Sequence, residues 1–598
     1  MKLSKLYTNS PNLFTPIKFN EELNVILGEI RHPDKNEKDT HNLGKTTLAK
    51  LLDFMFLAER NPKQFIFKNY NVFQSFTFYL ELKISESSYL TIKRDVSNNT
   101  RISFKIHEKK YQDYSKLDDT KWNHTDLPIE QAKSFLEGNL NFDVLNHWKY
   151  RNIIGYLIRT QNDFNDVFRL SKFQGKDIYW KPYIADLLGF NGQLAIQNYE
   201  KKSEISKLEE SIKTSPFNSK NLSEDLSNID GRILLRNNEL RHLSNFIDNF
   251  NFSEVDQETI NELVQHIDEK IAQLNMIEYS IKNNINRVED ALNTDDIKFN
   301  IKKVKILFEE AQILFPDQIT RDFEQLIQFN KTLTNERKGY LKEELNELKN
   351  ELDDIQIKLS ELNLERSKQI SFLAETELVV KFKQSNNQIS KIKGEIEFLN
   401  KQKQMIEKIQ SLEHEKRNLE DQLKHINDLM ETNVKLINED INSIFSKVRI
   451  YFNEIISDVI DKEGSIRVYL NGEDNFEYAA SYCNKDGDET SEGDGHSYKK
   501  FLCIAFDLAV ARAYIDKRYP KFLYIDGVFE GLDIRKKKNM LKVLRKYSQL
   551  GIQIILTTIN SDISELSSEN NPIFTKDEII LTLHDGGQDG LLFKMPNW

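Results

Sequence analysis

The motif with the clearest chemical potential is NLGKTTL at residues 42–48, which follows an apolar strand-like segment and opens an apolar helix-like segment. Backbone N–H groups at a helix N-terminus bind phosphates, a lysine there reaches the β- and γ-oxygens of a nucleotide, and the next hydroxyl ligates magnesium. The fit is incomplete, because Asp39 stands where a phosphate loop has its first glycine and the nearest upstream glycine is Gly28. An ordinary helix start is the alternative interpretation. The residues that we expect at the phosphates are Asn42, Gly44, Lys45, Thr46 and Thr47.

A second chemical signal is KFLYIDGVFEGLD at residues 521–533, in which a short apolar run ends in Asp526. A buried strand that ends in a carboxylate supplies a second magnesium contact in phosphate-loop proteins. Metal contacts are therefore expected from Thr46 and Asp526. A strand that ends in Asp-Gly is also an ordinary turn, and on this segment alone the two interpretations are equally good.

The elements that must position these residues form three regions of the chain. Residues 1–192 and 437–598 mix strand and helix patterns, and we expect them to be two halves of one α/β unit. Strands are predicted at 24–29 and in the segments SIRVYL, KFLYID and IQIILTT, a hairpin at 75–96, and a closing turn at Gly586-Gly587.

Residues 193–436 contain few glycines and prolines and should be mostly helical. Leucine and isoleucine repeat in a 4-3 spacing from Leu341 to Leu362, and a second apolar stripe runs from Val264 to Leu292 with Glu278 at one seam position. An antiparallel coiled-coil arm that turns back near 308–323 would join the two halves; arms of ~100 helical residues would reach ~150 Å. A compact helical bundle with the same stripes is the alternative.

Composition excludes several other classes of protein. The 598 residues carry 83 Lys+Arg against 94 Asp+Glu, a net charge of -11, which argues against a uniformly basic nucleic-acid binder. Two cysteines without a CxxC rule out a disulfide framework and a zinc hook, and no HExxH or GxSxG occurs. No long apolar run predicts a signal peptide or a membrane span, so we expect a soluble, cytoplasmic protein.

Strand, GKTT, long helical insertion and Asp-ended strand together resemble an SMC-type ABC ATPase, a P-loop fold. The resemblance implies an α/β fold class: a bipartite ABC-type ATPase head built from N- and C-terminal halves with a long antiparallel coiled-coil insertion. It implies ATP and Mg2+ as cofactors, and Gln161 of YLIRTQNDF as a residue at the metal and the attacking water. It also implies that Ser491, Gly493 and Gly495 of TSEGDGHS contact the nucleotide of a second subunit, with Asp533 at the same dimer interface.

Two departures from the family pattern concern hydrolysis. The glutamate that usually follows the second-strand aspartate is replaced by Gly527, which leaves Glu530 as the nearby carboxylate that could activate water. The expected switch histidine is missing, and Asn560 is the polar residue at that point. The catalytic residues implied are therefore Gln161, Asp526, Glu530 and Asn560, in a slow or DNA- or partner-stimulated ATPase.

In narrower detail, the short coil, the insert RHPDKNEKDTH and the segments IDGVFEGLD and TTINSD resemble the SMC-like subunit of Lamassu-type, three-component bacterial anti-phage systems. This implies a homodimeric DNA sensor that binds double-stranded DNA ends or unusual structures and controls a middle subunit and a nuclease-like effector. A RecN-like repair ATPase and a nucleotide-stabilised scaffold are the alternatives. The basic run Arg535, Lys536, Lys537 and Lys538 is the candidate DNA contact, although most such runs are solvated helix faces. The basic pair Lys499-Lys500 is open to the same two interpretations.

Overall fold

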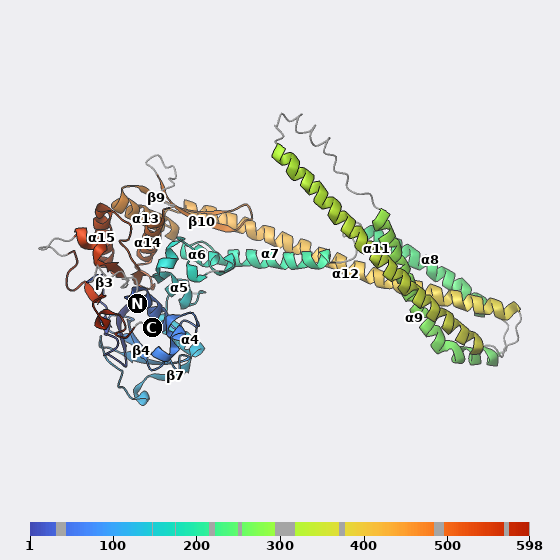
Figure 1. Ribbon diagram of the computed structural model, residues 1–598, viewed down its shortest axis with the longest axis horizontal. Helices are drawn as coiled ribbons and strands as arrows, with labels where there is room; N and C mark the ends of the chain where they lie inside the picture. Colours follow the sequence, from blue (N-terminus) through green and yellow to red (C-terminus); the bar gives the residue numbers. More distant parts are fainter. Residues whose placement is uncertain are drawn as a thin grey trace. The chain divides into compact units, whose positions relative to one another are not determined.

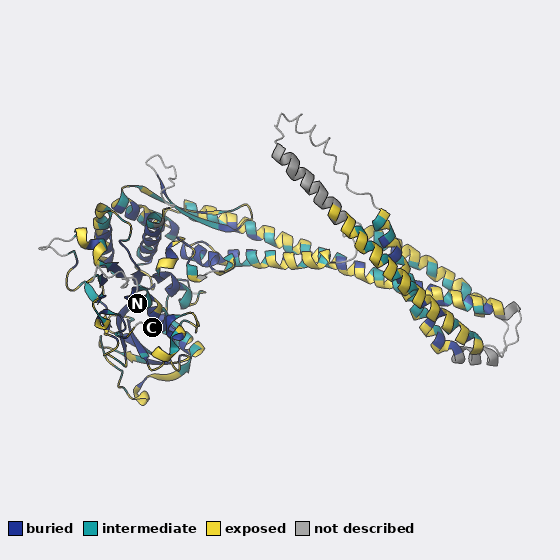
Figure 2. Ribbon diagram, viewed as in Figure 1, coloured by how far each residue is buried: buried dark blue, intermediate teal, exposed yellow. Residues whose placement is uncertain are grey.

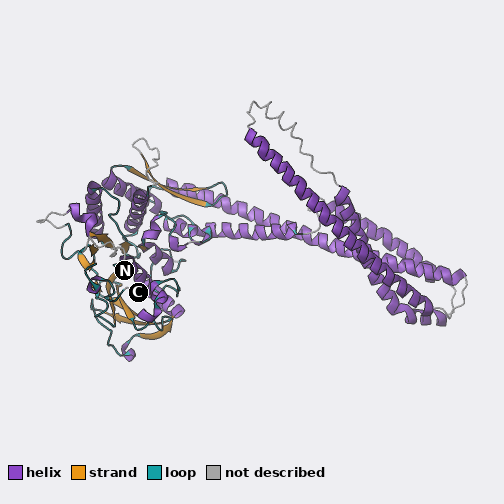
Figure 3. Ribbon diagram, in the orientation of Figure 1, coloured by secondary structure: helices purple, strands orange, loops and turns teal. Residues whose placement is uncertain are grey.

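The computed structural model describes residues 1–31, 43–145, 147–173, 175–214, 222–248, 254–293, 317–369, 377–483, 495–566 and 573–596. The chain divides into two compact units (Figure 3). The first contains Met1–Glu204 and Glu420–Trp598, and the second contains Ile205–Leu419. The protein is therefore an α/β chain with long helices, and both ends of the sequence contribute to the first unit.

A five-stranded parallel sheet joins the two ends of the chain. Its order is β13 (Ile579–His584), β3 (Leu23–Glu29), β12 (Gln553–Ile559), β11 (Phe522–Ile525) and β8 (Ile158–Arg159). β3 pairs with β12 from Leu23↔Ile554 to Gly28↔Ile559. The central strands are continuous apolar runs because both faces of a parallel sheet are covered. The predicted strands at 24–29, KFLYID and IQIILTT are confirmed.

A six-stranded antiparallel sheet accompanies it, in the order β2 (Ile17–Lys18), β1 (Lys2–Thr8), β4 (Thr77–Lys83), β5 (Tyr89–Asp95), β6 (Arg101–His107) and β7 (His124–Pro128). The predicted hairpin is confirmed, since β4 and β5 pair from Thr77↔Asp95 to Lys83↔Tyr89. The closing segment turns after β13 as expected but forms no further strand of a sheet; Phe593 instead makes an isolated bridge to Phe14.

Helices and the two sheets of the first unit share one apolar core, dark blue in Figure 2. Helices α1 and α14 contact β8 and β11 respectively, and α15 packs on β12 and β3. The helices of this unit are α1 (Lys45–Met55), α2 (Phe65–Lys68), α3 (Tyr70–Phe73), α4 (Ile129–Leu140), α5 (Tyr150–Leu157), α6 (Lys181–Leu187), α13 (Ile444–Ile460), α14 (His496–Ala513), α15 (Ile534–Gln549) and α16 (Asn560–Ile563).

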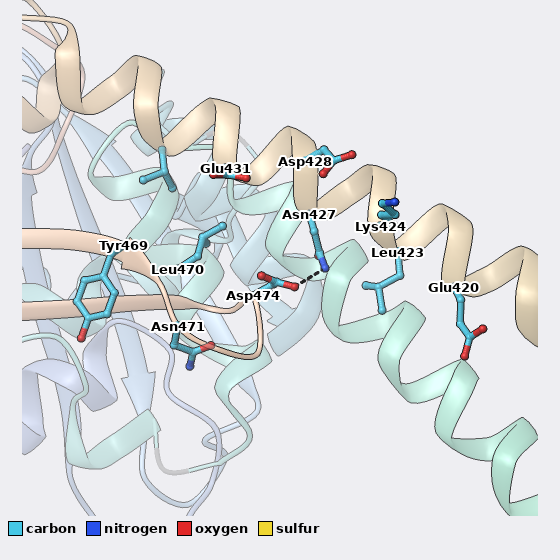
Figure 4. A pocket seen from close by; sticks show the side chains of 11 residues that line it. Glu420, Leu423, Lys424, Asn427, Asp428, Glu431, Tyr469, Leu470, Asn471 and Asp474 are labelled. Carbon is cyan, nitrogen blue, oxygen red and sulfur yellow. Dashed lines mark hydrogen bonds between the residues drawn. The ribbon is translucent and has the colours of Figure 1, made fainter.

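A two-stranded hairpin, β9 (Glu463–Leu470) and β10 (Phe476–Cys483), packs beside the part of α12 (Glu377–Glu439) that belongs to the first unit. β9 contains the predicted strand SIRVYL. Asn427 of α12 donates a 2.7 Å hydrogen bond to Asp474 in the hairpin turn, and Asn198 of α7 (Gly192–Lys213) donates to Asn427 at 2.6 Å. A hollow of about 580 Å³ remains between α12 and the hairpin (Figure 4).

The second unit contains the two predicted apolar seams, which pack against each other. α9 (Glu254–Asn293) and α11 (Asp317–Gln369) run antiparallel, since Asp268 pairs with Arg366 at 2.9 Å and Glu289 pairs with Lys349 at 3.1 Å. Glu278 occupies its seam position without an unpaired charge, because Gln356 and Lys282 donate to its carboxylate at 3.2 and 2.6 Å. The shared apolar cluster contains Ile267, Ile271, Ile281, Ile285, Ile355 and Leu359.

Helices α8 (Leu222–Asp248) and α12 also pack in this unit (Figure 1). α8 runs antiparallel to α12, with Asp230 on Lys403 at 2.7 Å and Arg236 on Glu395 at 2.8 Å. α12 also touches α9, where Gly394 lies against the backbone of Ala272 and Met276. Of the expected turn-back segment, residues 308–316 lie outside the described residues and 317–323 begin α11. No helix in the described parts of the chain is long and apolar enough to cross a membrane.

Candidate functional site

The site is built around the N-terminus of α1, where Gly44 has the left-handed φ of 104°. A Cβ at Gly44 would lie 2.6 Å from Cβ of Leu592, so both the backbone conformation and the packing require glycine. The Tyr524 hydroxyl of β11 donates to the carbonyl of Lys45 at 2.7 Å and fixes the start of the helix on the sheet. The first backbone N–H groups of a helix have no partner within the helix, so this end of α1 is of the kind that binds an anion.

Lys45 is buried at 7% exposure, and its ammonium makes no hydrogen bond or ion pair with any described residue. Burial lowers the pKa of Lys45, and the nearby carboxylates of Asp526, Glu530 and Asp562 oppose that shift. A largely buried cation without a direct partner is costly unless an anion completes its environment. This arrangement suits a phosphate group.

Asp526 ends β11 and is 1% exposed. The Thr46 hydroxyl donates to one of its oxygens at 2.8 Å, and the Thr557 hydroxyl of β12 donates to the other at 2.6 Å. Thr557 also accepts from the backbone N–H of Gly527 at 2.8 Å. Thr557 was not among the predicted site residues; its position near the end of the strand beside β11 is the signal that could have identified it.

Glu530 binds two partners from different segments. Lys500 of α14 pairs with one carboxylate oxygen at 2.9 Å, and the Gln161 amide donates to the other at 3.3 Å. Gly527 has a left-handed φ of 66°, and a Cβ there would lie 2.3 Å from that second oxygen. The Glu530 carboxylate therefore occupies the space into which a side chain at residue 527 would extend.

The sequence interpretation of Lys500 was wrong. As half of the basic pair Lys499-Lys500 it was considered a solvated face or a DNA contact, but the structure buries it at 3% exposure. Its charge is matched by Glu530, and its ammonium lies 4.9 Å from the ring centroid of Phe164. The available signal was its place in a helix that is apolar on almost all sides, since such a helix is buried.

Asp562, on the short helix after β12, is another carboxylate that the sequence did not single out. Burial raises its pKa, the charge of Glu530 adds to the rise, and Lys537 and Lys45 oppose it. Asn560, which we expected near the phosphates, starts the same helix and is exposed. Polar spacing alone does not distinguish which of the two faces Lys45.

Several other predicted residues take no part in these contacts or cannot be placed. Asn42, Ser491 and Gly493 lie outside the described residues, Thr47 is half-buried, and Gly495 is the exposed residue before α14. Asp533 caps α15 by accepting from the backbone N–H of Lys536 at 3.0 Å. In the basic run, Lys536 donates to the Tyr498 hydroxyl and Lys537 to the carbonyl of Asp562, whereas Arg535 and Lys538 are exposed.

These residues fit a nucleotide with its magnesium ion. The Thr46 hydroxyl donates its hydrogen to Asp526, which leaves an oxygen lone pair for a cation. Among the described residues no group of three or more His, Cys, Asp and Glu side chains could hold a metal ion. A cation between Thr46 and Asp526 would therefore take most of its ligands from phosphate and water, as magnesium prefers.

Comparison with known proteins finds only distant similarities. Residues 453–597 match a family model described as "Uncharacterised protein conserved in bacteria (DUF2326)". No curated protein matches the sequence. Among solved structures, the chain is similar to the Smc head domain with a coiled coil and joint from Pyrococcus yayanosii, at 14% identity over 95% of this chain and 94% of that one, with a TM-score of 0.34.

A second solved structure is the Smc head domain with an extended coiled coil bound to the C-terminal domain of ScpA from Pyrococcus furiosus. It is 12% identical over 94% of this chain and 91% of that one, with a TM-score of 0.29. Identities and scores this low say nothing about activity; the site residues themselves must indicate it.

Proposed function

We propose that the chain is an SMC-like ABC-type ATPase that binds ATP and Mg2+ at the N-terminus of α1 and hydrolyses ATP slowly. The observation that carries the proposal is the hydrogen bond from Thr46 to Asp526, at 2.8 Å, beside the ammonium of Lys45, which has no hydrogen-bond or ion-pair partner among the described residues. These residues come from opposite ends of the chain. Their meeting at one end of the parallel sheet matches the place where ligands bind in such sheets.

In this function each side chain has a distinct task. Lys45 and the first N–H groups of α1 hold the β- and γ-phosphates, and Thr46 with Asp526 holds the cation. Bound MgATP supplies an activated phosphoryl group whose developing charge the metal neutralises. Glu530 accepts the proton of the attacking water, and the Gln161 amide, which donates to Glu530 at 3.3 Å, helps to orient that water.

At the level of the cell, we propose a cytoplasmic, homodimeric DNA sensor in a bacterial anti-phage complex of the Lamassu type. Its support is the sequence resemblance together with two exposed cations, Arg535 and Lys538, on α15. Double-stranded DNA would bias an equilibrium between separate and ATP-bridged heads, with the signature residues and Asp533 at the dimer interface. The middle subunit and a nuclease-like effector would respond to that equilibrium.

The test is nucleotide binding by the full chain, with Lys45→Met as the variant and Lys50→Met as its control. Both lysines belong to α1, but Lys50 is exposed and makes no side-chain hydrogen bond or ion pair within the described residues. Lys45→Met should weaken MgATP binding by about tenfold or more, because a charge-assisted contact to phosphate is lost. Lys50→Met should bind as the unmodified chain does.

Equal affinity in both variants would refute the assignment of the site. Hydrolysis is measured alongside, with and without linear and circular DNA. Tight binding without turnover or ATP-dependent dimers under any of these conditions would leave the nucleotide a structural role and favour the scaffold alternative.

A further inference from the structure

The carboxylate assigned to water activation has no free oxygen. One oxygen of Glu530 is paired with Lys500 at 2.9 Å, and the other accepts from Gln161 at 3.3 Å. The first of these bonds is charge-assisted, and it joins a buried ammonium to a partly exposed carboxylate: the Lys500 side chain is 4% exposed and that of Glu530 is 35% exposed. Each oxygen keeps a further lone pair that could accept from water, so the two bonds do not block the carboxylate; they fix its position, and Lys500 neutralises its charge.

Lys500 does not act alone, because the first turns of α14 hold the whole segment that contains Glu530. Ser497 packs so closely on Gly531 that a Cβ there would lie 2.0 Å from the serine hydroxyl. The Tyr498 hydroxyl accepts from Lys536 of α15 at 3.1 Å. Four consecutive residues of α14 thus include three that contact residues 530–536. A shift of this end of α14 therefore displaces Glu530.

We propose that Lys500 is a latch: in the isolated chain its ion pair fixes the Glu530 carboxylate in place and neutralises its charge, and contacts on the N-terminal turns of α14 release it. The proposal rests on the ATPase function given above. It makes Lys500 a positioning residue, since its ammonium contacts the carboxylate assigned to catalysis. Because the ion pair restrains Glu530, basal turnover is low, and a second protein or subunit that binds at α14 determines the rate.

The test compares steady-state ATP hydrolysis by the full-length chain and by Lys500→Met. Methionine keeps most of the buried volume, and Glu530 retains access to solvent, so the variant should fold. Its kcat without DNA or partner should rise about tenfold, the factor expected when one charge-assisted bond is removed from the resting state. KM for ATP should not change, because Lys45 and Thr46 are untouched. The double variant Lys500→Met with Glu530→Gln should lose the gain.

Lys499→Gln is the matched control, since Lys499 lies on the same turn, is less buried and makes no side-chain hydrogen bond or ion pair with described residues. Its kcat should stay at the basal value. If Lys500→Met does not fold, as judged by its tryptophan emission, Lys500→Gln replaces it, because an amide still fills the site without a charge.

Turnover by Lys500→Met that is equal to or below that of the unmodified chain, with ATP still bound, would overturn the latch. An increase that survives Glu530→Gln would also overturn it, because the gain would not pass through that carboxylate. Failure of the unmodified chain to bind ATP is a different result, which refutes the proposed function itself.

Discussion

Restoring the glutamate that the ABC pattern expects at residue 527 should impair this protein. Gly527 adopts a φ of 66°, and a Cβ at that position would lie 2.3 Å from one oxygen of Glu530 and 2.8 Å from the other. A substituted residue 527 must therefore adopt a strained backbone and displace the Glu530 carboxylate from Lys500. Gly527→Glu and Gly527→Ala carry the same Cβ, so both should show the effect.

The expected loss in the free energy of unfolding has two parts. The left-handed conformation costs a residue with a Cβ about 1–2 kcal/mol. Losing the charge-assisted bond between Glu530 and buried Lys500 costs about 1.5–3 kcal/mol more. Gly551→Ala separates these parts, because Gly551 has a φ of 99° and nothing within 4 Å of its Cβ position. Gly551→Ala should cost only the first part, and Gly527→Ala the sum, about 2.5–5 kcal/mol.

Urea unfolding followed by tryptophan fluorescence measures these differences, because all four tryptophans lie outside the second unit, residues 205–419. ATP hydrolysis is measured on the same samples. Equal urea midpoints for Gly527→Ala and Gly551→Ala would show that Glu530 does not fill this space. Gly527→Ala should lower hydrolysis, unlike Lys500→Met, because the Cβ pushes the Glu530 carboxylate out of its place whereas Lys500→Met leaves it there; hydrolysis by Gly527→Ala above the basal rate would refute that displacement.

Two further predictions concern other parts of the chain. Gly394→Val should destabilise the second unit, because even a Cβ would approach the Met276 nitrogen to 2.9 Å and force α12 away from α9. The control Gly339→Ala should not, because nothing lies within 4 Å of a Cβ at that position. Helical circular dichroism on heating measures the difference, and equal losses in the two variants would refute the contact. His107 accepts from the Thr91 hydroxyl at 2.8 Å and donates to the Lys109 carbonyl at 2.9 Å, and burial lowers its pKa against the opposing charge of Glu81. Since the unfolded chain then binds the proton first, the free energy of unfolding should fall as pH drops below about 6.5 and level off below the folded pKa; an identical pH dependence in His107→Gln would refute this.

The parts of the site that follow from local sequence are those at the ends of apolar segments. Lys45 starts a helix after a strand, and Asp526 ends a strand, so both could be predicted without knowing their neighbours. Thr46 and Asp526 meet because β3, β12 and β11 are adjacent in one sheet, an arrangement that the alternation of strands and helices favours.

The remaining site residues depend on tertiary packing. In the sequence, Lys500 has the features of a surface lysine beside Lys499. Its partner, Glu530, is identified only because the structure buries α14 near Phe164 and Glu530. The contact of α12 with α9 is equally hidden, because it depends on one small residue, Gly394, in a long polar helix. Heptad spacing predicted which stripes are apolar but could not tell how many helices would share them.

From the sequence alone, glycine in place of glutamate at residue 527 indicates that the carboxylate that activates water has been lost. The structure supports a different inference. The left-handed turn at Gly527 lets the next three residues fold back, so that Glu530 fills the vacated space and faces the same end of the sheet as Asp526 and Lys45. A carboxylate placed three residues later belongs to a segment that α14 holds through Lys500 and Ser497. With the carboxylate at Glu530, hydrolysis would thus depend on the position of α14, and a glutamate at residue 527 would lack this dependence.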